Sequence, residues 1–249
     1  MKNPEFSFNK IPNKKSQGDG IEAGPRKILP AFIEFIERKE LTEAQKESEI
    51  VYYQKKYKLP YKEARTFFHY AFDFDIRVED MLNKKVVDIG SGHGNFKNAL
   101  EKIGIDGDLI TNLDRNLDDD YFKNTDVVGY AESLPLEDET FDVVLAHCST
   151  PIMQATSQEY ESIPRVISEM FRIAKKGGVI KIHPIAVVAK QKAPQQYKKD
   201  YLRMGSIVLE EIDKINKIDK DVKIKIIETK RDTADKDGFG IVWALELRK

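Results

Sequence analysis

The sequence lacks several features that would define a class of function. It holds a single cysteine, Cys148, which leaves no disulfide framework and no cysteine-rich zinc site. The 41 Lys and Arg residues balance 42 Asp and Glu residues, so net charge gives no reason to expect a nucleic-acid partner. The longest apolar runs, such as residues 185–189, are too short to span a bilayer, and residues 1–20 lack the apolar segment of a signal peptide. We therefore expect a cytoplasmic, globular protein with no membrane partner.

What the chain does contain is enough apolar material for a core. Hydrophobic residues make up 41% of its 249 residues, which excludes wholesale disorder and allows one large domain with an appendage. Residues 1–24 are rich in Lys, Asn, Pro and Gly without periodicity, and we interpret them as a flexible tail. Residues 25–84 are predicted to form a helical cap, and residues 85–249 the main domain.

Within the cap, three helices are expected. Pro30 predicts the start of the first, with the apolar residues at 32, 33, 35 and 36 on one face. Thr42 and Gln45 fit a capping box for the second, and Pro60 can open the third. Aromatic residues are dense between positions 52 and 74. Two interpretations of them stay open: packing of helices on a sheet, or the wall of a substrate pocket.

From residue 85 the pattern alternates between strands and helices. Strands are expected at residues 85–89, 109–113, 126–128, 141–146, 179–182, 222–229 and 241–247. Helices are expected at residues 96–103, 162–174, where Gly177 and Gly178 would stop the helix, and 195–218. This alternation predicts an α/β fold with a parallel sheet covered on both faces, and a ligand at the carboxyl ends of its strands.

A glycine-rich turn follows the first of these strands, and it reads Asp88-Ile89-Gly90-Ser91-Gly92-His93-Gly94. Glycines let a ligand approach the backbone because no Cβ intervenes. A dinucleotide site needs its third glycine three positions after the second, where this chain has Asn95. The carboxylate of Asp88 would also repel a pyrophosphate, whereas it suits a ligand with an amino group. The pattern therefore argues against NAD.

The Asp-x-Gly-x-Gly-x-Gly pattern resembles motif I of the class I S-adenosylmethionine (SAM)-dependent methyltransferases. Three later segments, residues 113–114, 129–145 and 169–178, are similar to the family's acid-ended second strand, its Gly-Asp-Ala-Glu-x-Leu-Pro-Phe stretch and its helix ending in Lys-Pro-Gly-Gly. The resemblance runs from about residue 86 to residue 183. It implies SAM as cofactor and a doubly wound, Rossmann-like sheet of seven strands, mostly parallel, with an antiparallel final strand.

The resemblance also implies a set of cofactor-binding residues, with Asp114 taking the ribose hydroxyls. The set is Asp88, Gly90, Ser91, Gly92, Gly94, Asp114, Arg115, Tyr130, Ala131, Glu132 and His147. Tyr130 stands where the family often has an aspartate near the adenine. The hydrogen bond from the adenine amino group to that aspartate would therefore be absent here or replaced by stacking on Tyr130. Only residues 115–125 separate the second strand from the third, and a parallel crossover needs about a dozen residues or more. The crossover helix should be very short or lost.

The candidates for chemistry are histidines. His147 and His183 follow two neighbouring strands, and His93 lies in the glycine turn, so all three reach the ligand side of the sheet. The resemblance places His147 where family members contact SAM or the acceptor. A neutral His147 could take a proton from a hydroxyl acceptor or could orient the acceptor, and His183 is the second catalytic candidate. A packing role for both stays open. A three-histidine metal site is conceivable, but we expect no metal.

Together these observations predict a SAM-dependent methyltransferase that acts on a small or medium-sized acceptor through an oxygen, nitrogen or carbon nucleophile. The cap would form much of the acceptor pocket. Two alternatives stay open: an RNA or protein methyltransferase, and a regulatory module that binds SAM without catalysis.

Overall fold

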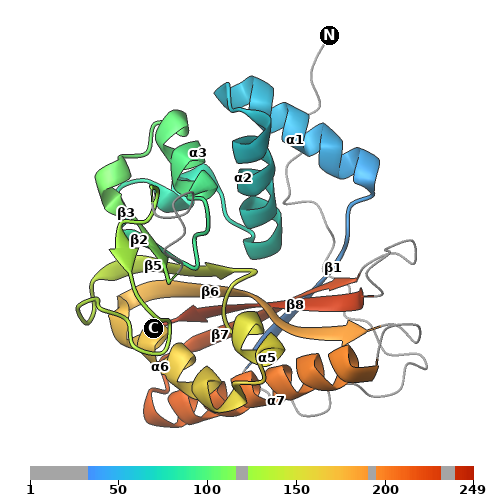
Figure 1. Ribbon diagram of the computed structural model, residues 1–249, viewed down its shortest axis with the longest axis vertical. Coiled ribbons are helices and arrows are strands. Elements are labelled where there is room, and N and C mark those ends of the chain that lie inside the picture. Colours follow the sequence, from blue (N-terminus) through green and yellow to red (C-terminus); the bar gives the residue numbers. More distant parts are fainter. Residues whose placement is uncertain (1–32, 116–122, 190–194, 231–238) are drawn as a thin grey trace.

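A sheet of eight strands forms the centre of the computed structural model, which describes residues 33–115, 123–189, 195–230 and 239–249 (Figure 1). The strand order is β1-β7-β8-β6-β5-β2-β3-β4. All pairs are parallel except those of β8, which is antiparallel to β6 and to β7. The strands are β1 (Ile33–Lys39), β2 (Val86–Ile89), β3 (Ile110–Asp114), β4 (Val127–Val128), β5 (Phe141–His147), β6 (Ala174–Ala189), β7 (Lys223–Lys230) and β8 (Phe239–Arg248).

Helices cover both faces of this sheet. The α-helices are α1 (Glu43–Tyr57), α2 (Tyr61–Phe74), α3 (Asn95–Ile103), α5 (Ile152–Thr156), α6 (Ile163–Ile173) and α7 (Gln195–Ile218), with short 3-10 turns at Val78–Met81, Gly107–Leu109 and Tyr160–Ser162. In Figure 1, α1, α2 and α3 lie above the sheet, and α5, α6 and α7 lie below it. Side chains of β2 point alternately to the two faces of the sheet. Val87 and Ile89 belong to the core between the sheet and α6 and α7, and Val86 belongs to the core between the sheet and α2 and α3.

The predicted first helix of the cap is wrong where the structure describes it. Ile33–Lys39 is a strand parallel to β7, so the sheet has eight strands instead of seven and the cap is not helical throughout. Phe35 meets Trp243 with ring centroids 5.8 Å apart, and Arg38 donates to the carbonyl of Asp73 at 2.8 Å. Ile and Phe side chains pack well on a half-buried sheet surface. The partner strand, β7, is distant in sequence, so no local pattern in residues 33–39 could predict the pairing.

The other two cap helices are confirmed. Thr42 Oγ1 accepts from the Gln45 amide at 3.3 Å while Gln45 Oε1 accepts from the Thr42 amide at 2.9 Å, and α2 starts directly after Pro60. Most aromatic side chains of this region pack in the core; Phe67, for example, lies against Phe96 with centroids 6.3 Å apart. The packing interpretation therefore describes most of them.

Some expectations fall outside the described residues. These are the tail at residues 1–24 and most of the short crossover, residues 116–122.

Helix α6 ends at Ile173, and Gly177 and Gly178 lie inside β6 instead of stopping the helix. None of the helices in the described part of the chain is long and apolar enough to cross a bilayer.

Candidate active site

A cavity of about 760 Å³ opens where β2, β3 and β5 reach their carboxyl ends. Seven of the predicted cofactor-binding residues line it: Gly90, Gly92, Asp114, Arg115, Tyr130, Ala131 and Glu132. We refer to it as the cofactor cavity. Its volume falls in the usual range for sites that hold a small molecule, roughly 300–1,000 Å³.

The glycine turn is held close to the chain that follows β5. Gly90 has a φ of +71°, and a Cβ at this position would lie 2.3 Å from Cβ of Ser149, so only glycine fits without a shift. Hydrogen bonds to β3 hold the turn from the other side. The Gly90 amide donates to the backbone carbonyl of Leu113 at 2.7 Å, and the Gly92 amide donates to the side-chain Oδ2 of Asp114 at 2.9 Å. The carboxylate of Asp114 thus ties the end of β3 to the turn at the cavity wall.

Asp88 does not line the cofactor cavity. Its side chain is fully buried on the side of α2, where the hydroxyl of Tyr70 lies 2.9 Å from both carboxylate oxygens. Burial raises the pKa of Asp88 to about 7, against the opposing effects of Tyr70 and His147, and the charge of Asp114 adds to the rise. In the ligand-free chain Asp88 therefore links α2 to β2. Ser91, Gly94 and His147 are likewise not among the residues that line the cavity.

The chain after β5 supplies lining residues that the sequence analysis missed: Cys148, Ser149, Thr150, Met153 and Gln154. Gln154 is buried and bridges two of its neighbours, because it accepts from Thr150 Oγ1 at 2.8 Å and donates to Glu132 Oε1 at 2.9 Å. This bridge positions Glu132 at the cavity. The signal that could have found these residues is their place directly after a strand that ends at the ligand side.

Beside the cofactor cavity lies a group of four residues, Asp73, His147, Cys148 and His183, which we call the His–Cys cluster. His147 and His183 face each other in register across β5 and β6, with ring centroids 5.1 Å apart. Asp73 Oδ2 lies 2.7 Å from Nε2 of His147 and 3.6 Å from Nδ1 of His183. The sequence analysis placed both histidines at this edge but did not foresee Asp73, which arrives from the last turn of α2.

The pKa values of the cluster shift together. Burial opposes ionisation of Asp73, but His183 and His147 outweigh it and lower the pKa of that carboxyl. Burial also opposes the charged form of His147, yet Asp73 and Cys148 raise its pKa to about 10. The thiol of Cys148 has its pKa lowered to about 6, because His147 and His183 outweigh its desolvation. His147 is therefore an imidazolium at pH 7, the opposite of the neutral base that the sequence-based hypothesis needs.

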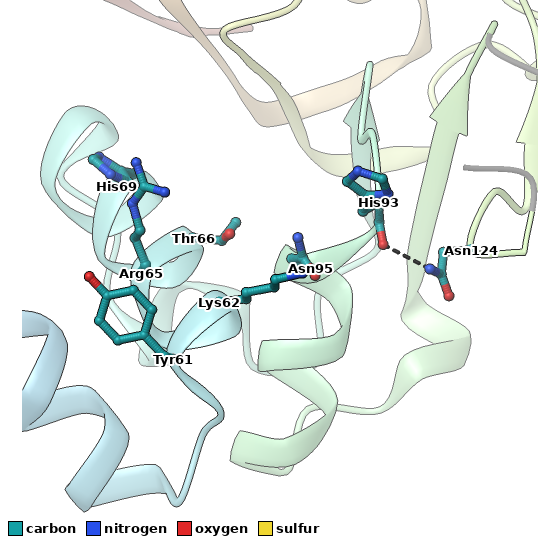
Figure 2. Close-up of a pocket in the computed structure, with 8 residues that line it drawn as sticks. All are labelled: Tyr61, Lys62, Arg65, Thr66, His69, His93, Asn95 and Asn124. Atoms are coloured by element: carbon teal, nitrogen blue, oxygen red, sulfur yellow. Dashed lines mark hydrogen bonds between the residues drawn. The ribbon is translucent and has the colours of Figure 1, made fainter. Parts of the chain in front are cut away.

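A second cavity, of about 440 Å³, lies between α2 and the glycine turn (Figure 2). Tyr61, Lys62, Arg65, Thr66 and His69 line it from α2, and His93, Asn95 and Asn124 line it from the other side. The ring centroids of His69 and His147 are 6.4 Å apart, so one lining residue of this cavity lies near the His–Cys cluster. We call it the α2 cavity.

The comparison with protein families covers the same region as the site. Residues 87–182 match the family model described as a methyltransferase domain. The matched region is similar to a methyltransferase domain and contains the glycine turn, β3 and β5. SAM is the ligand that the sequence analysis expects for this region. The cofactor cavity fits this ligand in volume and places an acid, Asp114, at the end of β3.

Solved structures with a similar fold are distant in sequence. A SAM-dependent methyltransferase from Methanosarcina mazei is 16% identical, with a TM-score of 0.44; the match covers 69% of this chain and 96% of that one. An S-adenosylmethionine-dependent methyltransferase from Mesorhizobium loti is 13% identical, with a TM-score of 0.45; the match covers 68% of this chain and 93% of that one. The search of curated proteins gives no match.

Proposed function

We propose that the protein transfers a methyl group from SAM to a small or medium-sized acceptor that enters through the α2 cavity. The observation that carries this proposal is that each of the two cavities has a lining residue next to His147. Cys148 lines the cofactor cavity, His69 lines the α2 cavity, and His147 lies next to both of these residues. A donor and an acceptor in the two cavities would approach each other at the cluster.

For the cofactor, we assign the backbone of Gly90 and Gly92 to close approach and Asp114 to the ribose hydroxyls. Tyr130, whose side chain is 63% exposed at the cavity, is assigned to stacking on the adenine. SAM itself supplies the activation, since its sulfonium makes the methyl group electrophilic. The tasks left to this chain are to hold the acceptor in line and to exclude water.

The size and lining of the α2 cavity support a small acceptor. Its volume, about 440 Å³, suits a small molecule, and α2 forms one of its walls. Lys62 and Arg65 line it, and none of its lining residues in the described part of the chain is acidic, so an acceptor with a negative group is favoured. His147 is assigned an orienting role, because a group that is already protonated at neutral pH cannot accept a proton.

Mass spectrometry after incubation with methyl-labelled SAM tests this function. The protein is mixed in parallel with a metabolite extract, with total RNA and with a protein extract. We expect label in a small molecule with the wild-type chain and a strong loss of label with Asp114→Ala. Label in RNA or in protein would instead support a macromolecular acceptor. SAM binding without any transfer would support the non-catalytic module.

A further inference from the structure

The His–Cys cluster has the composition of a metal site. One ring nitrogen of His147, one of His183 and Cys148 Sγ all lie within 4.8 Å of one another, and Cys148 Sγ is 4.0 Å from Nδ1 of His183. Thiolate sulfur and imidazole nitrogen are the donors that zinc prefers, whereas magnesium and calcium prefer oxygen donors. The donor set therefore points to a zinc-type divalent cation.

The spacing of the donors is close to what a metal needs. Ligands at about 2.0–2.1 Å for nitrogen and 2.3 Å for sulfur around a tetrahedral zinc lie about 3.3–3.6 Å from one another. The distances in the cluster are at most 4.8 Å, so they exceed this by no more than about 1.2–1.5 Å, a gap that changes in the side-chain χ angles would close on binding. No strand has to move.

The scaffold fixes the nitrogen donors and leaves the sulfur accessible. The side chains of His147 and His183 are 12% and 7% exposed, and the ring of Tyr70 stacks on His147 with centroids 4.6 Å apart. The Cys148 amide donates to the carbonyl of His183 at 2.6 Å, which holds the backbone of Cys148 against β6. Cys148 itself is exposed and lines the cofactor cavity.

Asp73 completes the arrangement. A histidine that binds a metal through one nitrogen usually donates its other N–H to a carboxylate, which fixes the ring and raises its basicity. Asp73 Oδ2 is 2.7 Å from His147 Nε2 and is in position to do this, or to serve as a fourth ligand. The alternative is a metal-free ion-pair network in which Asp73 lies between His147 and His183. That network would explain the carboxylate and the two imidazoles, but it would not require a cysteine at position 148.

We propose that His147, Cys148 and His183 bind one zinc-type divalent cation at the edge of the cofactor cavity, with Asp73 orienting His147 or completing the coordination. This goes beyond the proposed function, because it holds whichever acceptor is used. Binding of the cation displaces the proton that His147 carries in the metal-free chain, since only a neutral imidazole can be a ligand. It also revises the expectation of no metal. The site differs from the three-histidine arrangement considered from sequence, since His93 lines the α2 cavity instead.

Metal content decides the proposal. The full chain is equilibrated with zinc sulfate, freed of excess metal by gel filtration and analysed by inductively coupled plasma mass spectrometry. We expect one zinc per chain in the wild type and much less in Cys148→Ser and His183→Asn. His93→Asn, a histidine variant outside the cluster, should retain wild-type zinc. Thermal melting reports whether each variant is folded, and the exposed position of Cys148 makes its variant the safer one.

Cobalt(II) identifies the ligands. Replacement of zinc by cobalt should give a thiolate-to-cobalt charge-transfer band in the near ultraviolet and intense visible bands typical of tetrahedral geometry. The charge-transfer band should disappear in Cys148→Ser and remain in His93→Asn. A wild type that retains no metal after gel filtration would overturn the proposal and leave the cluster as an ion-pair network. A charge-transfer band that persists in folded Cys148→Ser would also overturn it, since Cys148 is the only cysteine.

Discussion

The cofactor cavity and the His–Cys cluster lie side by side, but they are built in opposite ways. The cavity is lined by short segments that each follow a strand, and backbone groups such as the Gly90 and Gly92 amides do much of the shaping. The cluster depends on side chains, and its four residues come from α2, β5, the position directly after β5, and β6. A site built from backbone leaves a local sequence pattern, whereas a site built from distant side chains leaves none.

Asp88 offers the sharpest test of this contrast, because it belongs to the glycine motif by sequence but packs against α2. With a folded-state pKa of about 7 and an ordinary unfolded-state value near 4, its carboxyl is protonated in both states at low pH. As pH rises from 4 to 7, the unfolded chain loses this proton first, and the folded state loses about 4 kcal/mol of stability.

The substitution Asp88→Asn should remove this loss. Denaturant unfolding in the presence of a chelator should find variant and wild type similar at pH 4 and the variant more stable at pH 8. The difference isolates Asp88 from other carboxylates, such as Asp142, whose pKa is lowered and whose contribution has the opposite sign. A difference that does not change with pH would show that the site of Asp88 favours neither protonation state.

Gly90→Ala tests the backbone-built region. The left-handed φ of +71° costs a non-glycine residue about 1–3 kcal/mol, and the clash of its Cβ with Ser149 adds about 1–3 kcal/mol. We expect a total loss of about 3 kcal/mol in unfolding experiments. Gly104→Ala is the matched control, because Gly104 also has a positive φ but no atom lies within 4 Å of its would-be Cβ. Equal losses in the two variants would mean that close packing at Gly90 is unimportant.

Asp114→Ala tests the side chain that we assign to the ribose hydroxyls in the cofactor cavity. A hydrogen bond to a charged group contributes about 1.5–3 kcal/mol, so SAM affinity should fall roughly ten- to a hundredfold in titration calorimetry. Asp108→Ala, at an exposed acid near the start of β3, should leave the affinity as it is in the wild type. An unchanged affinity in Asp114→Ala would remove the ribose assignment.

Tyr130 should give the smallest effect. A stacking contact is worth about 0.5–1.5 kcal/mol, so Tyr130→Ala should weaken SAM binding about two- to tenfold. Tyr130→Phe should bind like the wild type if only the ring face is used. A loss in Tyr130→Phe as large as in Tyr130→Ala would point to the hydroxyl and against stacking.

The sequence predicts the local features of this fold better than the features that depend on contacts between distant segments. Strands β2 and β5, the glycine turn and the capping box at Thr42 are local patterns, and the structure places them where the sequence predicts. Strand β1 was predicted as a helix, because its pairing with β7 joins segments nearly 200 residues apart. Only a tertiary contact could correct that prediction.

The site shows the same limit. His147 and His183 were placed at the ligand edge because each follows or lies in a strand of known direction. The charge of His147 was not predictable, since it depends on Asp73 and Cys148 lying beside it. Asp88 was assigned to the cofactor from its place in the motif, but the pleat of β2 turns its side chain to Tyr70.

Strand β1 has a consequence for the solubility of the folded chain. It covers the edge of β7, whose residues Ile224, Ile226 and Ile227 are buried. An uncovered edge of this kind offers unpaired amides and carbonyls to another chain and promotes edge-to-edge aggregation. The outer strand itself carries charged residues, with Glu34 and Lys39 exposed, and charged side chains on an edge strand discourage such pairing. Seven residues far from any methyltransferase motif thus protect the sheet from self-association.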